Sequence, residues 1–356
     1  MSSRLSVVVV GAGYWGPNLA RNFRASPDWD LAAICDLDLE RAQRVADAVG
    51  GVRVTSSLDD VLADPTVDAI AIATPARTHH PIAMAALEAG KHVIVEKPLA
   101  DESARGIEMV ERAHERGLVL MTDHTFCYTP AVLKIRELIA DGYLGDILFI
   151  DSVRINLGLI QPDVDVFWDL APHDLSILLY VLGCEPQEVS ARGTSSVRPG
   201  IHDVAYVELR FPNNILAHLH LSWLDPCKVR RITIVGSKKM VVCNDLSDSE
   251  KVRIYDKGVD QPYETDQFKD FHLQYRYGTV TIPWIPFREP LRVQCEHFIE
   301  CAKTGQTPQS DGTVGTRVVR ILELADKSLQ NGGGLQHVPM DMVIDTPAVF
   351  LQPVAD

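Results

Sequence analysis

Two residues four positions apart, Asp169 and His173, have the types and spacing to move a proton. On a helix they would share one face, so the carboxylate could orient the imidazole and raise its basicity. Such a histidine can take a proton from an alcohol while hydride leaves the carbon. The alternative is an aspartate that caps the helix and a buried histidine bonded to backbone. Since Pro172 is tolerated in a first turn, the helix is expected to begin near Ala171.

Lys97 is a second candidate for proton transfer. It follows Glu96 at the end of an apolar segment, and Pro98 ends that segment. In an open parallel sheet, ligands lie beyond the carboxyl ends of the strands, which is where Glu96 and Lys97 are expected. A lysine there can take part in acid–base chemistry. The alternative is a surface lysine beside a strand.

The segment Gly11–Gly16 matches G-x-G-x-x-G, and it follows four valines and precedes a helical pattern. The first glycine permits a tight turn, and the second, Gly13, lets backbone approach a pyrophosphate. The third permits close helix–strand packing. The helix N-terminus offers free N–H groups to phosphates. The alternative is a glycine turn that packs a helix and binds nothing.

An acidic residue, Asp36, ends the next predicted strand, 20 residues after Gly16. A carboxylate there accepts hydrogen bonds from the adenosine ribose and repels a 2′-phosphate. The sequence therefore predicts binding of NAD rather than NADP.

The elements that must position these residues change in character near residue 124. Before it, short apolar strands alternate with helical patterns, which predicts a parallel α/β sheet, a Rossmann domain over residues 1–124. After it, segments of period-two alternation predict an α+β domain over 125–356, with a mostly antiparallel, open-faced sheet. Asn213-Asn214 is a predicted hairpin turn. The predicted strands are 6–10, 31–35, 69–73, 92–96, 119–122, 146–155, 188–193, 205–211, 215–223, 230–235 and 251–255, and the predicted helices are 17–25, 39–49, 58–63, 80–89, 103–116, 130–141, 168–182, 290–303 and 311–330.

Composition excludes several classes of protein. The 356 residues carry a formal net charge of −14 and show no Lys/Arg cluster, so no nucleic-acid partner is expected. No apolar run approaches the roughly 20 residues that span a bilayer, and no export signal is apparent. Seven irregularly spaced cysteines without C-x-x-C indicate reduced thiols in a cytoplasmic protein.

No metal site is expected. Cys295 and His297 would point roughly 200° apart on a helix, so they cannot share one ion with Cys301. His218 and His220 share a strand face but lack an evident third ligand. That face is expected to meet solvent or another subunit.

Three motifs in order, G-A-G-Y-W-G, V-E-K-P-L and D-L-A-P-H-D, resemble the Gfo/Idh/MocA family of oxidoreductases over nearly the whole chain. The resemblance implies hydride transfer between a nicotinamide and a secondary alcohol of a sugar, sugar nucleotide or cyclitol. It also implies a homodimer or homotetramer formed through the C-terminal sheet.

Carried over by motif, Lys97 would be the catalytic lysine, and Asp169 and His173 the acid–base and substrate-orienting pair. The residues that the resemblance places at the cofactor, with Gly11, Gly13, Gly16 and Asp36, are Tyr14, Trp15, Thr74, Pro75, His79, Glu96 and Lys97.

The chain departs from the family pattern at two points. Many relatives carry an arginine where this chain has Thr125–Pro130, so Tyr128 is the candidate to replace that substrate contact. Trp168 is a separate candidate for contact with the substrate. At the second point, Ala171 stands where the aspartate–histidine motif usually has a glycine, and Pro172 follows it.

Within the family, Tyr14–Leu19 and Trp168–Asp174 resemble the sugar-nucleotide members, the UDP-N-acetylglucosaminuronate 3-dehydrogenases. The alternatives are an inositol or free-sugar dehydrogenase, an NAD-assisted glycoside-cleaving enzyme, and a non-catalytic NAD-sensing protein.

Overall fold

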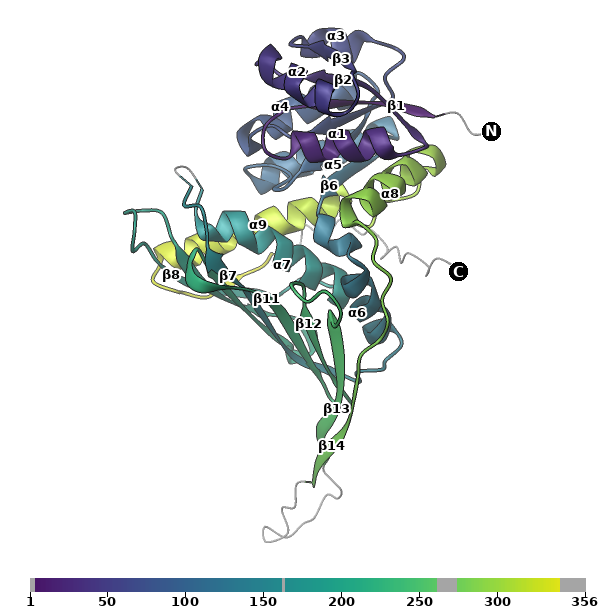
Figure 1. The fold of residues 1–356 in the computed structure, drawn as a ribbon. Coiled ribbons are helices and arrows are strands. Elements are labelled where there is room, and N and C mark those ends of the chain that lie inside the picture. The colour runs from purple at the N-terminus through teal and green to yellow at the C-terminus, as the bar shows by residue number, and fades with distance from the viewer. Residues whose placement is uncertain (1–3, 162–163, 261–273, 340–356) are drawn as a thin grey trace. The chain divides into compact units, whose positions relative to one another are not determined.

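The computed structural model describes residues 4–161, 164–260 and 274–339, which fall into two compact units (Figure 1). The first unit holds the described residues up to Thr129 together with Arg288–Glu323. The second holds those of Pro130–Phe287 and Leu324–Met342.

The first unit contains a six-stranded sheet with the order β3-β2-β1-β4-β5-β6, in which every pairing is parallel. Val7–Val10 are buried because such a sheet is covered on both faces. The predicted parallel sheet is confirmed, and the short strand β3 was missed. Its strands are β1 (Leu5–Val10), β2 (Trp29–Cys35), β3 (Arg53–Thr55), β4 (Ala69–Ile72), β5 (His92–Glu96) and β6 (Leu120–Asp123).

Helices connect these strands, and their starts follow local sequence signals. Asp38 and Ser57 cap two of them by accepting the N–H groups of Arg41 and Asp60. The helices of the first unit are α1 (Gly16–Ala25), α2 (Leu39–Ala48), α3 (Leu58–Ala63), α4 (His79–Glu88), α5 (Ser103–Arg116), α8 (Pro290–Thr304) and the start of α9 (Gly312–Gln330), with 3-10 turns η1 (Ala76–Thr78) and η2 (Thr125–Tyr128).

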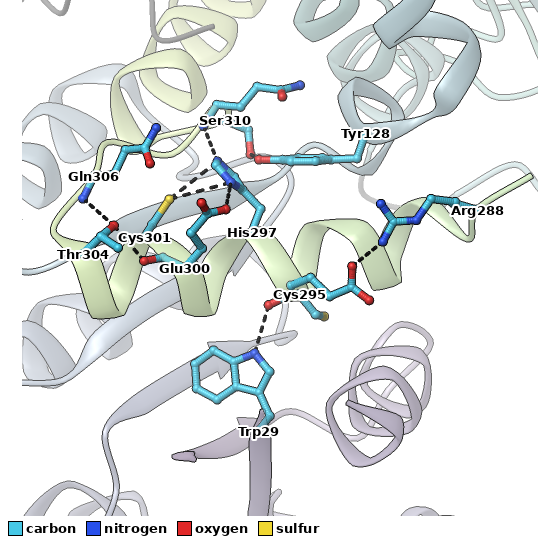
Figure 2. A network of polar contacts seen from close by, with 12 residues as sticks. Trp29, Tyr128, Arg288, Cys295, His297, Glu300, Cys301, Thr304, Gln306 and Ser310 are labelled. Carbon is cyan, nitrogen blue, oxygen red and sulfur yellow. Dashed lines mark hydrogen bonds and ion pairs between the residues drawn. The ribbon is translucent and has the colours of Figure 1, made fainter. Parts of the chain in front are cut away.

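Helix α8 comes late in the sequence but packs on α1 and η2. The Trp29 ring stacks on Phe298 at 5.3 Å, and its indole N–H donates to the Cys295 carbonyl at 2.9 Å (Figure 2). The compact units therefore divide the chain differently from the predicted boundary at residue 124. Apolar contacts made by α8 place 288–323 with the Rossmann sheet, and a pattern read along the sequence does not report such long-range packing.

The second unit contains a nine-stranded sheet of order β14-β13-β12-β11-β7-β10-β9-β8-β15. All pairings are antiparallel except β7 with β10. The predicted antiparallel sheet is confirmed. Its strands are β7 (Ile147–Leu157), β8 (Glu188–Thr194), β9 (Val204–Arg210), β10 (Leu216–Ser222), β11 (Leu224–Gly236), β12 (Met240–Asn244), β13 (Val252–Asp260), β14 (Gln274–Thr281) and β15 (Gln336–His337).

The predicted turn at Asn213-Asn214 joins the antiparallel strands β9 and β10. Both asparagines adopt positive φ, 60° and 61°, a conformation that asparagine tolerates better than most residues. The turn lies within the short 3-10 segment η3 (Pro212–Asn214).

Two helices of the second unit, α6 (Pro130–Ala140) and α7 (Val166–Leu182), pack on one another (Figure 1). Helix α7 also packs on β9 and β10. On β10, Ala217, Leu219 and Leu221 are buried, whereas His218 and His220 on the opposite face are half-buried. The alternation predicted for this strand is confirmed. Among the described residues, no helix is both long and apolar enough to cross a membrane.

Candidate functional site

The glycine loop joins β1 to α1, and its three glycines are required for different reasons. Gly11 has a φ of +101°, and a Cβ atom there would lie 2.6 Å from the Ala73 carbonyl oxygen. A Cβ on Gly16 would clash with the carbonyl oxygen of Gly11. A Cβ on Gly13 would meet nothing within 4 Å. Gly11 and Gly16 therefore shape the loop, while Gly13 leaves open space for a ligand.

The start of α1 is suited to bind an anion. None of the described side chains caps this helix, and its first turn contains no acidic residue. Within this turn Pro17 has no N–H, and Asn18 donates its N–H to the Trp15 carbonyl at 2.9 Å. A phosphate would therefore meet the positive end of the helix dipole and the N–H groups that precede Pro17. Tyr14 is 89% exposed, and its ring meets that of Trp15 edge to face at 5.9 Å.

Asp36 follows β2, at the same edge of the sheet. One of its carboxylate oxygens accepts the N–H of Ala12 at 2.6 Å, and the other accepts the N–H of Asp38 at 2.8 Å. The carboxylate therefore fixes the glycine loop, and its remaining lone pairs can accept from ribose hydroxyls.

Two glycine substitutions should separate ligand binding from folding. Gly13→Ala places its methyl group in open space, so the unfolding temperature should stay the same while the Kd for NAD rises by about tenfold. Gly16→Ala should lower the unfolding temperature, because backbone must move away from the new Cβ. Thermal unfolding and NAD titration of both variants provide the measurement. Unchanged NAD affinity in Gly13→Ala would contradict a close approach of the cofactor to residue 13.

The loops after β4 and β5 are joined by His79. Its ring nitrogens lie 2.8 Å from the Thr74 carbonyl oxygen and 2.9 Å from that of Pro98. Burial lowers the pKa of this imidazole. A neutral ring carries one N–H, which can donate to either carbonyl. His79 thus positions the loop of Thr74 and Pro75 relative to the loop that follows Lys97.

Lys97 follows a pair of buried carboxyl groups at the ends of β5 and β6. Glu96 pairs with Asp123 across the two strands, and both side chains are buried. Burial, and after it the neighbouring Asp123, raises the pKa of Glu96 well above its ordinary value. The nearby Lys97 ammonium opposes this shift. Glu96 therefore tends to retain its proton, which limits the negative charge beside Lys97.

Replacement of Glu96 should reveal this effect in the stability of the protein without ligand. When the pKa of a carboxyl group is raised in the folded state, the protein becomes less stable as pH rises from about 4.3, the ordinary glutamate value, toward the raised value. Glu96→Gln should therefore stabilise the protein at neutral pH, and the gain should vanish near about pH 4. Unfolding temperatures of both proteins across this range test it. A gain independent of pH would contradict it.

Asp123 and His124 were missed by the sequence analysis. They follow β6 as Glu96 and Lys97 follow β5, and adjacent pairing of Glu96 with Asp123 brings the four residues together. Burial and the Lys97 ammonium lower the pKa of His124 to about 3, so its imidazole is neutral. Ligands lie beyond the carboxyl ends of parallel strands, and this rule indicated Lys97. The same rule applies to the residues after 122, so it could also have indicated Asp123 and His124.

In the second unit, α7 presents Asp169 and His173. The helix begins at Val166, because the Asp165 carboxylate accepts the N–H groups of Phe167 and Trp168. The expected start near Ala171 is therefore wrong, and Pro172 lies inside the helix. Asp169 is in the first turn but is not the cap, and its carboxylate accepts the Trp223 indole N–H at 3.3 Å. His173 follows one turn later and is half-buried.

A buried ion pair fixes this helix to the sheet. Asp174 accepts from the Arg154 guanidinium of β7 at 2.6 and 3.2 Å and from the Ser152 hydroxyl at 2.8 Å. All three side chains are buried. Since Asp174 is next to His173, the ion pair between Arg154 and Asp174 also helps to fix the turn of α7 that carries the histidine.

The two candidate substrate contacts differ in their surroundings. Trp168 is half-buried, and its indole N–H donates to Asp326 at 2.6 Å. Tyr128 is fully buried in the first unit, where its hydroxyl lies 3.1 Å from the Ser310 hydroxyl and its ring lies beside His297 (Figure 2). This geometry argues against the predicted substrate contact of Tyr128, because its hydroxyl is used within the fold. The burial followed from the packing of α8, which the sequence did not reveal.

The histidines considered as metal ligands have other partners. On α8, His297 accepts the N–H of Gln309 at 3.0 Å and lies 3.5 Å from the Cys301 sulfur (Figure 2). On the open sheet face, His218 and His220 stack against Tyr206. The described residues contain no cluster of three possible metal ligands.

The structure thus brings together one set of predicted residues in each unit. In the first, the glycine loop, Asp36, the Thr74 loop, Glu96 and Lys97 share the carboxyl edge of the parallel sheet. In the second, Asp169 and His173 lie on the first turns of α7. The Rossmann edge can hold a dinucleotide, and the groups of α7 can exchange a proton with a ligand.

This combination of fold and residues agrees with the comparison to known families. The model described as "Oxidoreductase family, NAD-binding Rossmann fold" of Gfo/Idh/MocA matches residues 5–124, and that of the Gfo/Idh/MocA C-terminal domain matches 132–242. The chain belongs to the Gfo/Idh/MocA family. It is an NAD-binding oxidoreductase, which confirms the predicted cofactor and class of enzyme.

Several relatives are similar over nearly the full length. UDP-N-acetylglucosamine 3-dehydrogenase of Acidithiobacillus ferrooxidans is 28% identical over 324 residues, covering 87% of this chain and 93% of that protein. Its solved structure, GnnA, has a TM-score of 0.77 at 25% identity, covering 93% and 99% of the two chains. Myo-inositol 2-dehydrogenase of Thermotoga maritima is 26% identical over 337 residues, covering 92% and 96%. GenD2 from gentamicin A biosynthesis, solved with NAD, has a TM-score of 0.78 at 26% identity, covering 95% and 97%.

Proposed function

We propose that this enzyme transfers a hydride between NAD and a secondary alcohol or ketone carbon of a sugar nucleotide, with C3 of a UDP-sugar as the first choice. The observation that carries the proposal is Lys97 at the carboxyl edge of an NAD-binding sheet, in a chain that also presents Asp169 and His173 on α7. The similarity to a UDP-N-acetylglucosamine 3-dehydrogenase supports this class of substrate.

The cofactor would be held by the glycine loop and Asp36. The pyrophosphate would lie over Gly13 at the N-terminal end of α1, and the adenosine ribose would lie at Asp36. Strands β4, β5 and β6 form the other half of the sheet, so Thr74, Pro75, Glu96 and Lys97, which follow β4 and β5, would border the nicotinamide. When bound, NAD accepts or returns the hydride.

The side chains would manage the proton of the reacting oxygen. In the oxidative direction, His173 takes the hydroxyl proton, Asp169 orients the imidazole and stabilises its charged form, and Lys97 donates a hydrogen bond to the reacting oxygen. The reduction of a ketone runs through the same states in reverse. Trp168 remains a candidate substrate contact.

A cyclitol is the second candidate for the substrate, because a myo-inositol 2-dehydrogenase is 26% identical over most of this chain. A cyclitol presents a ring of secondary hydroxyls without a diphosphate. A sugar-nucleotide substrate would therefore need an anion-binding region in the substrate site, and a cyclitol would not.

The direct test is NADH formation with a panel that includes UDP-N-acetylglucosamine, UDP-N-acetylglucosaminuronate, myo-inositol and free glucose. We expect turnover with a UDP-sugar and a product oxidised at C3, identified by mass spectrometry after borodeuteride reduction. Turnover with inositol alone would favour the second candidate. Glycoside cleavage without net NADH would indicate NAD-assisted elimination, and NAD binding without turnover on any compound would indicate a sensor.

We also propose a homodimer or homotetramer formed through the outer face of the nine-stranded sheet. Large apolar side chains are exposed on strands of this sheet, among them Phe149, Tyr206 and Leu216. Light scattering after size exclusion tests the mass, and a monomer would contradict the proposal. The cytoplasmic location and the lack of a nucleic-acid partner remain predictions from composition.

A further inference from the structure

His124 is a buried polar residue whose ring has no use within the described fold. It is 1% exposed, and neither ring nitrogen has a hydrogen-bond partner among the described residues. A buried imidazole without a partner costs free energy, and such groups in native proteins call for an explanation. Other buried histidines of the first unit have partners: His79 lies between two carbonyl oxygens, and His297 accepts a backbone N–H.

The backbone holds His124 in place. Its N–H donates to the Thr122 carbonyl at 2.7 Å, and its own carbonyl accepts from the N–H of Cys127 at 2.9 Å. The residue directly follows β6, so it lies at the carboxyl edge of the sheet, next to Lys97. An imidazole held at this edge, with both nitrogens unused by the described fold, is available to bind a ligand group that reaches the end of β6.

The topology indicates which part of NAD it would meet. The order β3-β2-β1-β4-β5-β6 places Asp36 after β2, in the half of the sheet that binds adenosine. The half formed by β4, β5 and β6 then serves the nicotinamide mononucleotide. His124 follows β6, the outermost strand of that half.

We propose that His124 binds the carboxamide group of the nicotinamide through its neutral imidazole. A neutral imidazole offers one N–H donor and one acceptor nitrogen, and a carboxamide offers the complementary acceptor and donor. The Lys97 ammonium is beside it and burial is complete, and both disfavour a second proton on the ring. His124 therefore keeps an acceptor nitrogen across the working pH range. The assignment rests on the cofactor placement proposed above.

The test compares NAD with ADP-ribose, which lacks the nicotinamide. His124→Phe should raise the Kd for NAD by about tenfold, the loss of one or two hydrogen bonds, and should leave the Kd for ADP-ribose the same. His124→Gln, which retains a donor and an acceptor, should recover part of the NAD affinity. Without ligand, His124→Phe should unfold at no lower temperature than the wild type, since the residue it replaces has no partner.

His297→Phe provides the matched control, because His297 is also buried in the first unit but bonds to Gln309. It should lower the unfolding temperature and leave the ratio of the two Kd values unchanged. The proposal is overturned if His124→Phe weakens NAD and ADP-ribose equally, if it changes neither Kd, or if it raises only the KM of the sugar substrate. Lack of NAD and ADP-ribose binding in the wild type would instead refute the cofactor site itself.

Discussion

Lys97→Met and His173→Gln should each lower kcat by between about 10² and 10⁴ fold, the usual contribution of a general acid–base group. The Kd for NAD should stay within about threefold of the wild type, because the glycine loop and Asp36 supply most of the proposed cofactor contacts. Steady-state kinetics and NAD titration measure the two quantities on the same preparations.

A lysine on the exposed surface, Lys238, gives the matched control. Lys238→Met removes the same charge and should leave kcat unchanged. The assignment of the site fails if both Lys97→Met and His173→Gln turn over at the wild-type rate. A loss confined to KM would mean that these residues bind substrate without moving a proton.

Asp174→Asn should lower the free energy of unfolding by about 3–5 kcal/mol, because it removes the carboxylate charge that is paired with the buried Arg154 guanidinium. Urea unfolding followed by circular dichroism measures the change. His173 is adjacent on α7, so kcat should fall as well even where the variant remains folded.

The double variant Arg154→Met/Asp174→Leu is the informative control. It removes both charges and fills the space with apolar atoms, so it should recover most of the stability that Asp174→Asn loses. Asp151→Asn, at a half-exposed carboxylate beside His218, should change stability by no more than about 1 kcal/mol. A loss in Asp151→Asn as large as that in Asp174→Asn would contradict an argument based on burial.

Most of the Rossmann fold could be predicted because its signals are local. Four valines, a glycine loop and an acidic residue after the second strand occur in a fixed order, and each has a physical reason. The short strand β3, at the edge of the sheet, has three residues and no apolar run, so no pattern could reveal it. The packing of α8 beside β2 depends on the side chains Trp29 and Phe298, which are far apart in sequence.

The candidate site was predicted only where a motif or a strand end marked it. Lys97 and His173 were found in this way, and their roles stay predictions. His124 also directly follows a strand, but no motif marks it, and the departure from the family pattern begins one residue later, at Thr125–Pro130. Tyr128 was chosen by position in that segment, whereas its hydroxyl bonds to Ser310, 182 residues later in the chain. Helix α7 began earlier than expected because Asp165 is a stronger start signal than Pro172.

The carboxylate of Asp36 has a consequence for laboratory evolution of cofactor preference. It accepts the N–H groups of Ala12 and Asp38, so the same atoms that would select against a 2′-phosphate also hold the loop in shape. A single exchange to a basic or small residue relieves the repulsion of NADP but also releases two backbone N–H groups. Variants that use NADP well should therefore arise in pairs of changes, the second of which restores an acceptor for Ala12. The path between the two cofactors passes through an intermediate that binds both poorly.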